Sequence, residues 1–129
     1  MGKYIDLMAN FLTEDDWSYK TYTAEDGGIF LRSPYAAKHC TFDVVFDASD
    51  SKDWVLIFIY PNIYTPEKYQ HTIAELICRL NQRITLGCFE FDFSDNAIRF
   101  RSAIDIEGSE LTSTIFFNLL KSALITMDK

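Results

Sequence analysis

The sequence has few of the residues that build linkers, disulfide frameworks or metal sites. Its 129 residues include five Gly, three Pro, two His and three Cys. Scarce glycine and proline exclude a low-complexity or linker-rich architecture. The three cysteines, Cys40, Cys78 and Cys88, form no Cys-x-x-Cys pair and lack the spacing to histidine that is typical of a metal site. Such unpaired cysteines favour a reducing compartment, so we expect a cytoplasmic protein.

Positive charge is also scarce. Lys and Arg total 12 against 19 Asp and Glu, which gives a net charge of −7. Nucleic-acid binding depends on the neutralisation of phosphates by Lys and Arg, and anionic membrane surfaces attract basic segments. The charge therefore disfavours nucleic acid and membrane as partners and favours neutral or basic protein segments.

No long hydrophobic run is present. The longest, from Trp54 to Pro61, is far shorter than the roughly 18 residues that cross a bilayer. Near the N-terminus an acidic residue, Asp6, comes early, and no hydrophobic stretch typical of a signal peptide surrounds it. We expect neither a membrane span nor a secretory signal.

Apolar residues nevertheless make up 48% of the chain, and 16% of it is aromatic. This is enough for the core of a single domain over residues 1–129. The predicted element order, α-β-β-β-β-α-β-β-α, lacks regular βαβ alternation, which predicts an α+β fold with a mainly antiparallel sheet. Apolar periodicity predicts helices beginning near residues 3, 65 and 109, and strands at 17–23, 29–33, 40–47, 54–60, 89–93 and 98–101.

Two of these elements carry more apolar surface than one sheet face needs. The strand at 54–60 is apolar on both faces, which predicts a central strand or one that lies against a partner. The last helix is apolar nearly all round. Helices on both sides of the sheet would account for this surface within a monomer, but we favour a dimer or partner interface. The candidate contact residues are Val55, Ile57, Ile59, Phe117 and Ile125.

A charged hairpin is the sharpest local signal. Phenylalanine alternates with acids over residues 89–93, and arginine alternates with apolar residues over 98–101. A two-residue turn at Asp95-Asn96 would pair Asp92 with Arg99 and Glu90 with Arg101. We predict one apolar face and one face of ion pairs.

None of the candidate reactive groups forms a recognisable catalytic or metal motif. The acids between Asp43 and Asp53 lack the glycine and the spacing of a calcium loop. Glu90 and Asp92 would both be kept ionised by the facing arginines, which disfavours a general acid. The adjacent side chains of His39 and Cys40 would point to opposite faces of a strand. We therefore predict no catalytic, cofactor-binding or metal site.

A family resemblance rests on the C-terminal half. The stretch Gly87-Cys88-Phe89-Glu90-Phe91-Asp92, followed by Ile98-Arg99-Phe100-Arg101, resembles the YbjN family, whose members look like type III secretion chaperones in fold. Residues 73–81 match the preceding helix of that family, and residues 15–19 look like the entry from its first helix. The resemblance implies a small, acidic, cytoplasmic, non-enzymatic protein that is often a homodimer.

Two functional hypotheses follow. The first is a chaperone-like or regulatory protein-binding module that acts as a homodimer and takes up a partner segment by strand addition or groove binding. Uncompensated acids lie mostly in the first two-fifths of the chain, so we expect a basic, apolar partner whose association slows with added salt. The alternative is an enzyme or small-molecule binder whose site is assembled from scattered residues, for example an acid with His39 or Cys40.

Overall fold

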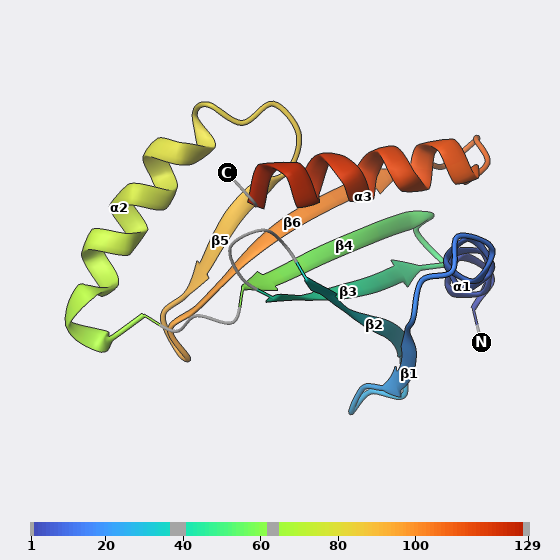
Figure 1. Ribbon diagram of the computed structural model, residues 1–129, viewed down its shortest axis with the longest axis horizontal. Helices are drawn as coiled ribbons and strands as arrows, with labels where there is room; N and C mark the ends of the chain where they lie inside the picture. Colours follow the sequence, from blue (N-terminus) through green and yellow to red (C-terminus); the bar gives the residue numbers. More distant parts are fainter. Residues whose placement is uncertain (1, 37–40, 62–64, 128–129) are drawn as a thin grey trace.

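The computed structural model describes residues 2–36, 41–61 and 65–127. It contains an antiparallel sheet with the strand order β1-β2-β3-β4-β6-β5 (Figure 1). The α+β class, the antiparallel sheet and the predicted element order are confirmed. The elements are α1 (Lys3–Glu14), β1 (Lys20–Thr23), β2 (Ile29–Ala36), β3 (Thr41–Ser49), β4 (Trp54–Pro61), the 3₁₀ turn η1 (Glu67–Tyr69), α2 (Gln70–Asn81), β5 (Cys88–Asp92), β6 (Ala97–Asp105) and α3 (Ser113–Met127).

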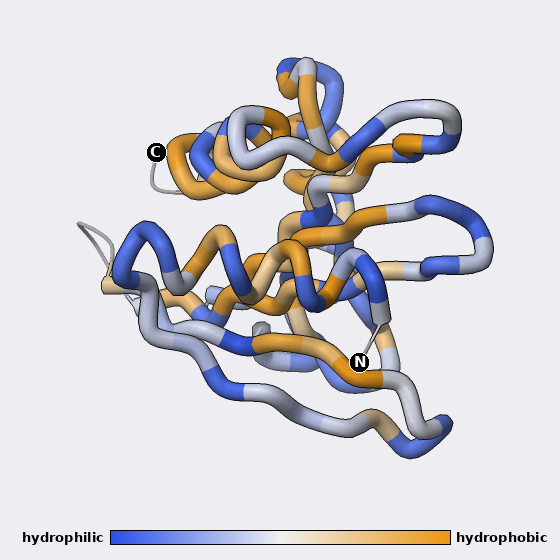
Figure 2. Tube along the Cα trace, turned by 90° about the vertical axis from the view of Figure 1, so that its right-hand side faces the viewer, coloured by the Kyte–Doolittle hydropathy of each residue, from blue (hydrophilic) through white to orange (hydrophobic). Residues whose placement is uncertain are grey.

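One face of the sheet holds the core. Helix α1 packs on β2 and β3, and α3 packs on β4 and β6. Along α1, hydrophobic and hydrophilic residues alternate with the turns of the helix, as expected when one side is buried (Figure 2). The helix face of the sheet meets these helices in a single apolar cluster. Its fully buried side chains include Met8, Leu12, Leu31, Val44, Phe46, Val55, Ile57, Ile59, Phe100, Phe116 and Leu120.

The central position predicted for the strand at 54–60 is confirmed, because β4 pairs with β3 and β6. Only one of its two apolar faces is buried within the chain, however. Val55, Ile57 and Ile59 lie in the core, whereas Leu56 and Phe58 on the other side are half-exposed. The second face of the sheet is therefore apolar but has no helix over it in the described part of the chain.

The hairpin register differs from the predicted one by two residues. Glu90 lies opposite Arg99, and Asp92 lies opposite Ala97. The turn is longer than predicted because its acidic side chains bind backbone: the N–H of Ser94 donates to Asp92 Oδ1 at 2.8 Å, and the N–H of Ala97 donates to an Asp95 carboxylate oxygen at 2.9 Å. A shift of two residues keeps every side chain on its face, so the predicted charged and apolar faces survive.

Other boundaries also differ from the predicted ones. The strand predicted at 29–33 continues through Pro34, which lies inside β2 and pairs with Asp43 of β3. Proline has no backbone N–H to donate to a neighbouring strand. Because β1 pairs with β2 only up to Arg32, no strand on that side of Pro34 requires such a hydrogen bond. The last helix begins after Thr112 rather than at Ser109, and the Thr112 hydroxyl accepts from the N–H of Ile115 at 3.2 Å.

The acids between β3 and β4 hold the N-terminal helix. The backbone N–H groups of Lys3 and Tyr4 donate to the Asp50 carboxylate at 2.9 and 3.3 Å. A Cβ on Gly2 would lie 2.4 Å from Oδ2 of the same carboxylate, so a larger residue at this position would displace the Asp50 side chain. The Tyr4 hydroxyl donates to Asp53 Oδ1 at 2.5 Å. Asp50 thus caps the helix, and Asp53 binds a side chain of its first turn.

No helix in the described ranges is long and apolar enough to cross a membrane.

Candidate functional site

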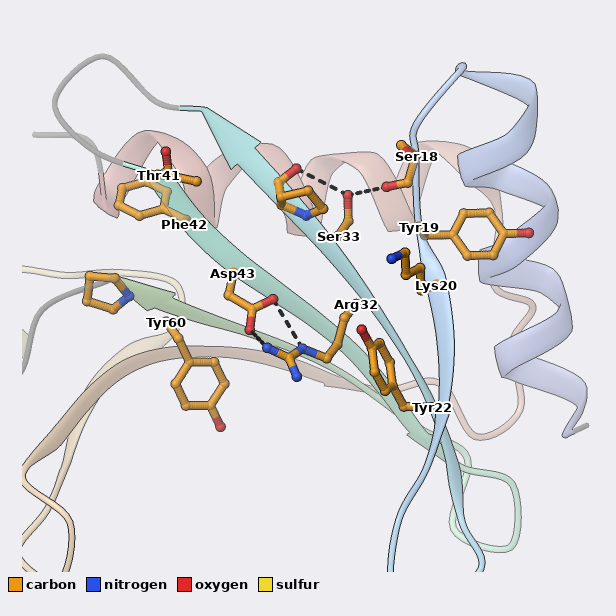
Figure 3. A pocket seen from close by; sticks show the side chains of 12 residues that line it. Ser18, Tyr19, Lys20, Tyr22, Arg32, Ser33, Thr41, Phe42, Asp43 and Tyr60 are labelled. Carbon is orange, nitrogen blue, oxygen red and sulfur yellow. Dashed lines mark hydrogen bonds and ion pairs between the residues drawn. The ribbon is translucent and has the colours of Figure 1, made fainter.

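The uncovered face of the sheet carries aromatic side chains between two ion pairs. It looks toward the viewer in Figure 3, with α3 behind the strands and α1 at the right. Alternation along each strand brings residues of all six strands of the sheet to this face. We call this surface the open face, and define it by Tyr22, Phe30, Arg32, Asp43, Val45, Phe58, Tyr60, Arg99, Arg101 and Glu90.

Three hollows on this face meet at one residue. They have volumes of about 520, 610 and 350 Å³ and all are open to solvent. Tyr60 lines all three; Arg32 and Asp43 line the first two, and Arg99 lines the last two. The hollows therefore form one shallow trough that runs across the strands, from the β1 side of the sheet to the β5–β6 turn.

At one end of the trough, Arg32 is bound to Asp43. Its Nε donates to Asp43 Oδ1 at 3.3 Å, and its Nη2 donates to Oδ2 of the same carboxylate. The guanidinium lies over the ring of Tyr22, 5.1 Å from the centroid, and that ring stacks on Phe30 (Figure 3 labels Tyr22, Arg32 and Asp43). The hydrogen bond with Asp43 raises the pKa of Arg32 above its ordinary value despite partial burial. The bond thus favours the charged form of the Arg32 guanidinium.

At the other end, Arg99 binds Glu90 and Tyr60. Its Nε donates to Glu90 Oε1 at 2.7 Å, and its Nη1 donates to the Tyr60 hydroxyl at 3.1 Å. The guanidinium lies 4.3 Å from the centroid of the Phe58 ring. Partial burial opposes the charge of Arg99, but the bonds with Tyr60 and Glu90 outweigh it and raise the pKa. Arg101 approaches the second Glu90 oxygen at 3.7 Å.

This geometry is suited to holding a ligand. Each acid within the trough's two ion pairs is bound to a guanidinium. Over residues 2–36, 41–61 and 65–127, no three His, Cys, Asp or Glu side chains gather in a group that could hold a metal ion. His39 and Cys40, which the sequence offered to an alternative site, lie outside the described residues.

The five predicted contact residues differ in how far they are buried. Val55, Ile57 and Ile59 are fully buried in the core, and this burial argues against a partner contact because they have no surface to offer. Phe117 is half-buried and packs edge-on against the buried ring of Phe116, with 5.0 Å between the two ring centroids. Ile125 is 61% exposed on α3. These residues therefore lie apart and form no common surface.

The predicted contact residues leave out two surfaces. The open face uses Phe58 and Tyr60, which lie on the other side of the strand at 54–60. Helix α2 exposes Leu76 and Leu80. The signal for both was present, since apolar residues on two faces of one strand and a second amphipathic helix are visible in the sequence.

Comparisons with known proteins agree with this fold. The family described as "YbjN: Putative bacterial sensory transduction regulator" matches residues 4–129. The chain therefore belongs to the YbjN family, and its class is that of a bacterial regulator-like protein. No curated protein matches the sequence.

A solved structure shares the fold. It is described as "Crystal structure of YbjN, a putative transcription regulator from E. coli", and it superposes with a TM-score of 0.68. The match covers 96% of this chain and 85% of the E. coli chain, at 9% sequence identity. At this identity the likeness establishes the fold and leaves the role of individual residues to this chain's own geometry.

Proposed function

We propose that the chain is a non-enzymatic regulatory module that acts as a homodimer and binds an extended segment of a partner protein in the trough of the open face. The observation that carries this proposal is the meeting of three hollows at Tyr60, between two fixed ion pairs. The family's description as a regulator supports the coarser part of the proposal.

The shape and composition of the trough favour a protein segment. Small-molecule sites enclose most of their ligand's surface, whereas these hollows are open along their length. Tyrosine, phenylalanine and arginine are the side chains enriched in protein interfaces, and tyrosine and arginine dominate binding energy there. Phe58 and Tyr60 supply apolar contact area at the centre of the trough, flanked by Arg32 and Arg99.

The fixed ion pairs predict how a partner is recognised. The hydrogen bonds to Asp43 and Glu90 hold the two guanidinium groups before a partner arrives, which lowers the entropy cost of binding. We expect apolar side chains of the partner to contact the rings and its polar groups to meet the exposed edges of the two arginines. Contact with the rings supplies affinity, and the arginines fix orientation.

A peptide selection tests the proposal. A displayed library of random peptides is selected on the wild-type protein, and the dissociation constants of enriched peptides are measured by fluorescence anisotropy. Tyr60→Ala removes the side chain common to all three hollows, so we expect binding to weaken by about tenfold or more. Ile125→Ala, at an exposed apolar residue outside the trough, is the control and leaves affinity unchanged. Failure to enrich any peptide, or equal loss in both variants, would contradict the proposal.

A further inference from the structure

The trough of the open face changes the sign of its charge from one end to the other. The hollow on the β1 side is lined by two cations, Lys20 and Arg32, and one acid, Asp43, for a net charge of +1. The middle hollow is lined by two arginines and two acids and is neutral. The hollow at the β5–β6 turn is lined by one arginine and three acids, for a net charge of −2. The trough therefore has a positive and a negative end.

The two ion pairs do not produce this difference. In each of them an arginine is bound to an acid, so each pair cancels its own charge. The difference comes from Lys20 at one end and from Asp92 and Asp95 at the other. In the part of the chain that the structure describes, these three side chains form no ion pair. All three are exposed, so their charges are open to a partner.

The positive end lies at the edge of the sheet. Lys20 of β1 pairs with Arg32 of β2, so the two side chains lie on the same face. Figure 3 labels Lys20 among the side chains at this end of the trough. Because Asp43 already binds Arg32, the Lys20 ammonium is the group that can bind an acidic side chain of the partner.

The β5–β6 turn holds the acids of the negative end. Asp92 Oδ1 accepts from the N–H of Ser94 at 2.8 Å and from its hydroxyl at 2.6 Å, and Asp95 accepts from the N–H of Ala97 at 2.9 Å. The bonds with Ser94 lower the pKa of Asp92 below its ordinary value, so this carboxylate is charged at neutral pH. Each carboxylate keeps acceptor sites for a cation of the partner.

The width of the sheet sets the spacing of the partner's charges. From β1 to β5 there are five strand intervals of about 4.8 Å, which gives about 24 Å. An extended segment rises about 3.3 Å per residue, so about eight residues span this distance. We infer that the trough binds an extended segment with an acidic residue at the β1 end, a basic residue at the β5–β6 end, and apolar or aromatic residues between them. This inference rests on the proposed function and names the chemistry of the partner.

Charge also fixes which end of the segment lies at which end of the trough. In this placement both ends of the segment meet opposite charge, whereas the reverse placement brings like charges together twice. Phe58 and Tyr60 at the centre contact apolar side chains in either placement. A wholly basic segment, which the uncompensated acids of the sequence had suggested, matches only one end.

A peptide library that varies only the ends tests the inference. Displayed nine-residue peptides keep tyrosine, valine and serine in the middle and vary the first two and last two positions among Glu, Lys and Ser. On the wild-type protein we expect enrichment of peptides with Glu at one end and Lys at the other. Because exposed charge pairs are weak, we expect their dissociation constants, measured by fluorescence anisotropy, to be about fivefold lower than those of peptides with Ser at both ends.

Two variants assign the ends. Lys20→Glu reverses the charge at the β1 end, so we expect affinity for the enriched peptides to fall by about fivefold and to return when the peptide's Glu is changed to Lys. Asp92→Asn with Asp95→Asn keeps acceptor oxygens for the turn and removes both charges, which should abolish the preference for Lys. Lys121→Glu, at an exposed lysine of α3, is the matched control and leaves affinity unchanged.

The outcomes separate this inference from the proposed function. Enriched peptides with the same charge at both ends, or equal affinities in Lys20→Glu and Lys121→Glu, would overturn the inference. If Tyr60→Ala still weakened these peptides, the trough would remain the binding site. Failure to enrich any peptide on the wild-type protein would overturn both. Circular dichroism checks that each variant is folded.

Discussion

At the scale of single residues, the bond between Tyr4 and Asp53 links the first helix to the β3–β4 turn. The hydrogen bond to Asp53 raises the pKa of the Tyr4 hydroxyl from 10.0 to about 12, and burial adds to the shift. The neutral hydroxyl is the form that donates, so folding favours the protonated tyrosine. Asp50 caps the same helix, so this corner of the molecule depends on two carboxylates.

The shift predicts a loss of stability at alkaline pH. Because the pKa is raised in the folded state, the contribution of Tyr4 is complete below pH 10 and disappears as pH rises toward about 12. Urea denaturation at pH 8 and pH 11 measures this loss in the wild type and in Tyr4→Phe. We expect the wild type to lose more stability than the variant across the interval. Parallel losses in the two proteins would show that the bond does not form.

At the scale of elements, periodicity predicts which segments form helices and strands but not how they face one another. The alternation at 89–93 and 98–101 predicts a charged and an apolar face correctly, since both registers preserve it. The register itself depends on bonds between Asp92, Asp95 and the turn backbone, which periodicity does not contain. The apolar spacing of α2 is the same whether a helix packs on its own sheet or on a partner, so its orientation could not be predicted.

Two hydrogen bonds at the end of α2 give a prediction at this scale. Asn81 donates to the carbonyl oxygen of Phe89 at 3.0 Å and accepts from its N–H at 2.7 Å, and so occupies backbone groups of β5, which is an edge strand of the sheet. Asn81→Ala removes both hydrogen bonds and should cost about 1–2 kcal/mol in the free energy of unfolding. We also expect faster amide exchange across α2, measured by mass spectrometry. Gln82→Ala, at the exposed neighbouring residue, is the control. Equal stability and exchange in both variants would contradict a clamping role for Asn81.

At the scale of the whole molecule, negative charge and apolar surface lie apart. The open face balances its arginines with Asp43 and Glu90, and residues 65–86 are nearly neutral. Asp50 and Asp53, between β3 and β4, bind the first turn of α1. The trough could not be predicted in detail because its hollows depend on which side of each strand the helices leave uncovered.

This distribution predicts the effect of salt on self-association. Two chains of charge −7 repel each other at a distance, and salt screens that repulsion over about 10 Å at 0.1 M and about 3 Å at 1 M. We expect the dimer dissociation constant to fall between about 0.1 and 1 M NaCl, as measured by sedimentation. A dissociation constant that rises with salt would indicate an interface held by charge pairs.

The most direct test of the account is a map of where a partner segment binds. Amide chemical shifts of the ¹⁵N-labelled protein are followed during titration with a peptide selected on the wild type. The account predicts that the largest changes fall on open-face residues of β2, β3, β4 and β6, centred on Tyr60. Changes confined to α2 and α3, or scattered without a centre on the sheet, would contradict it.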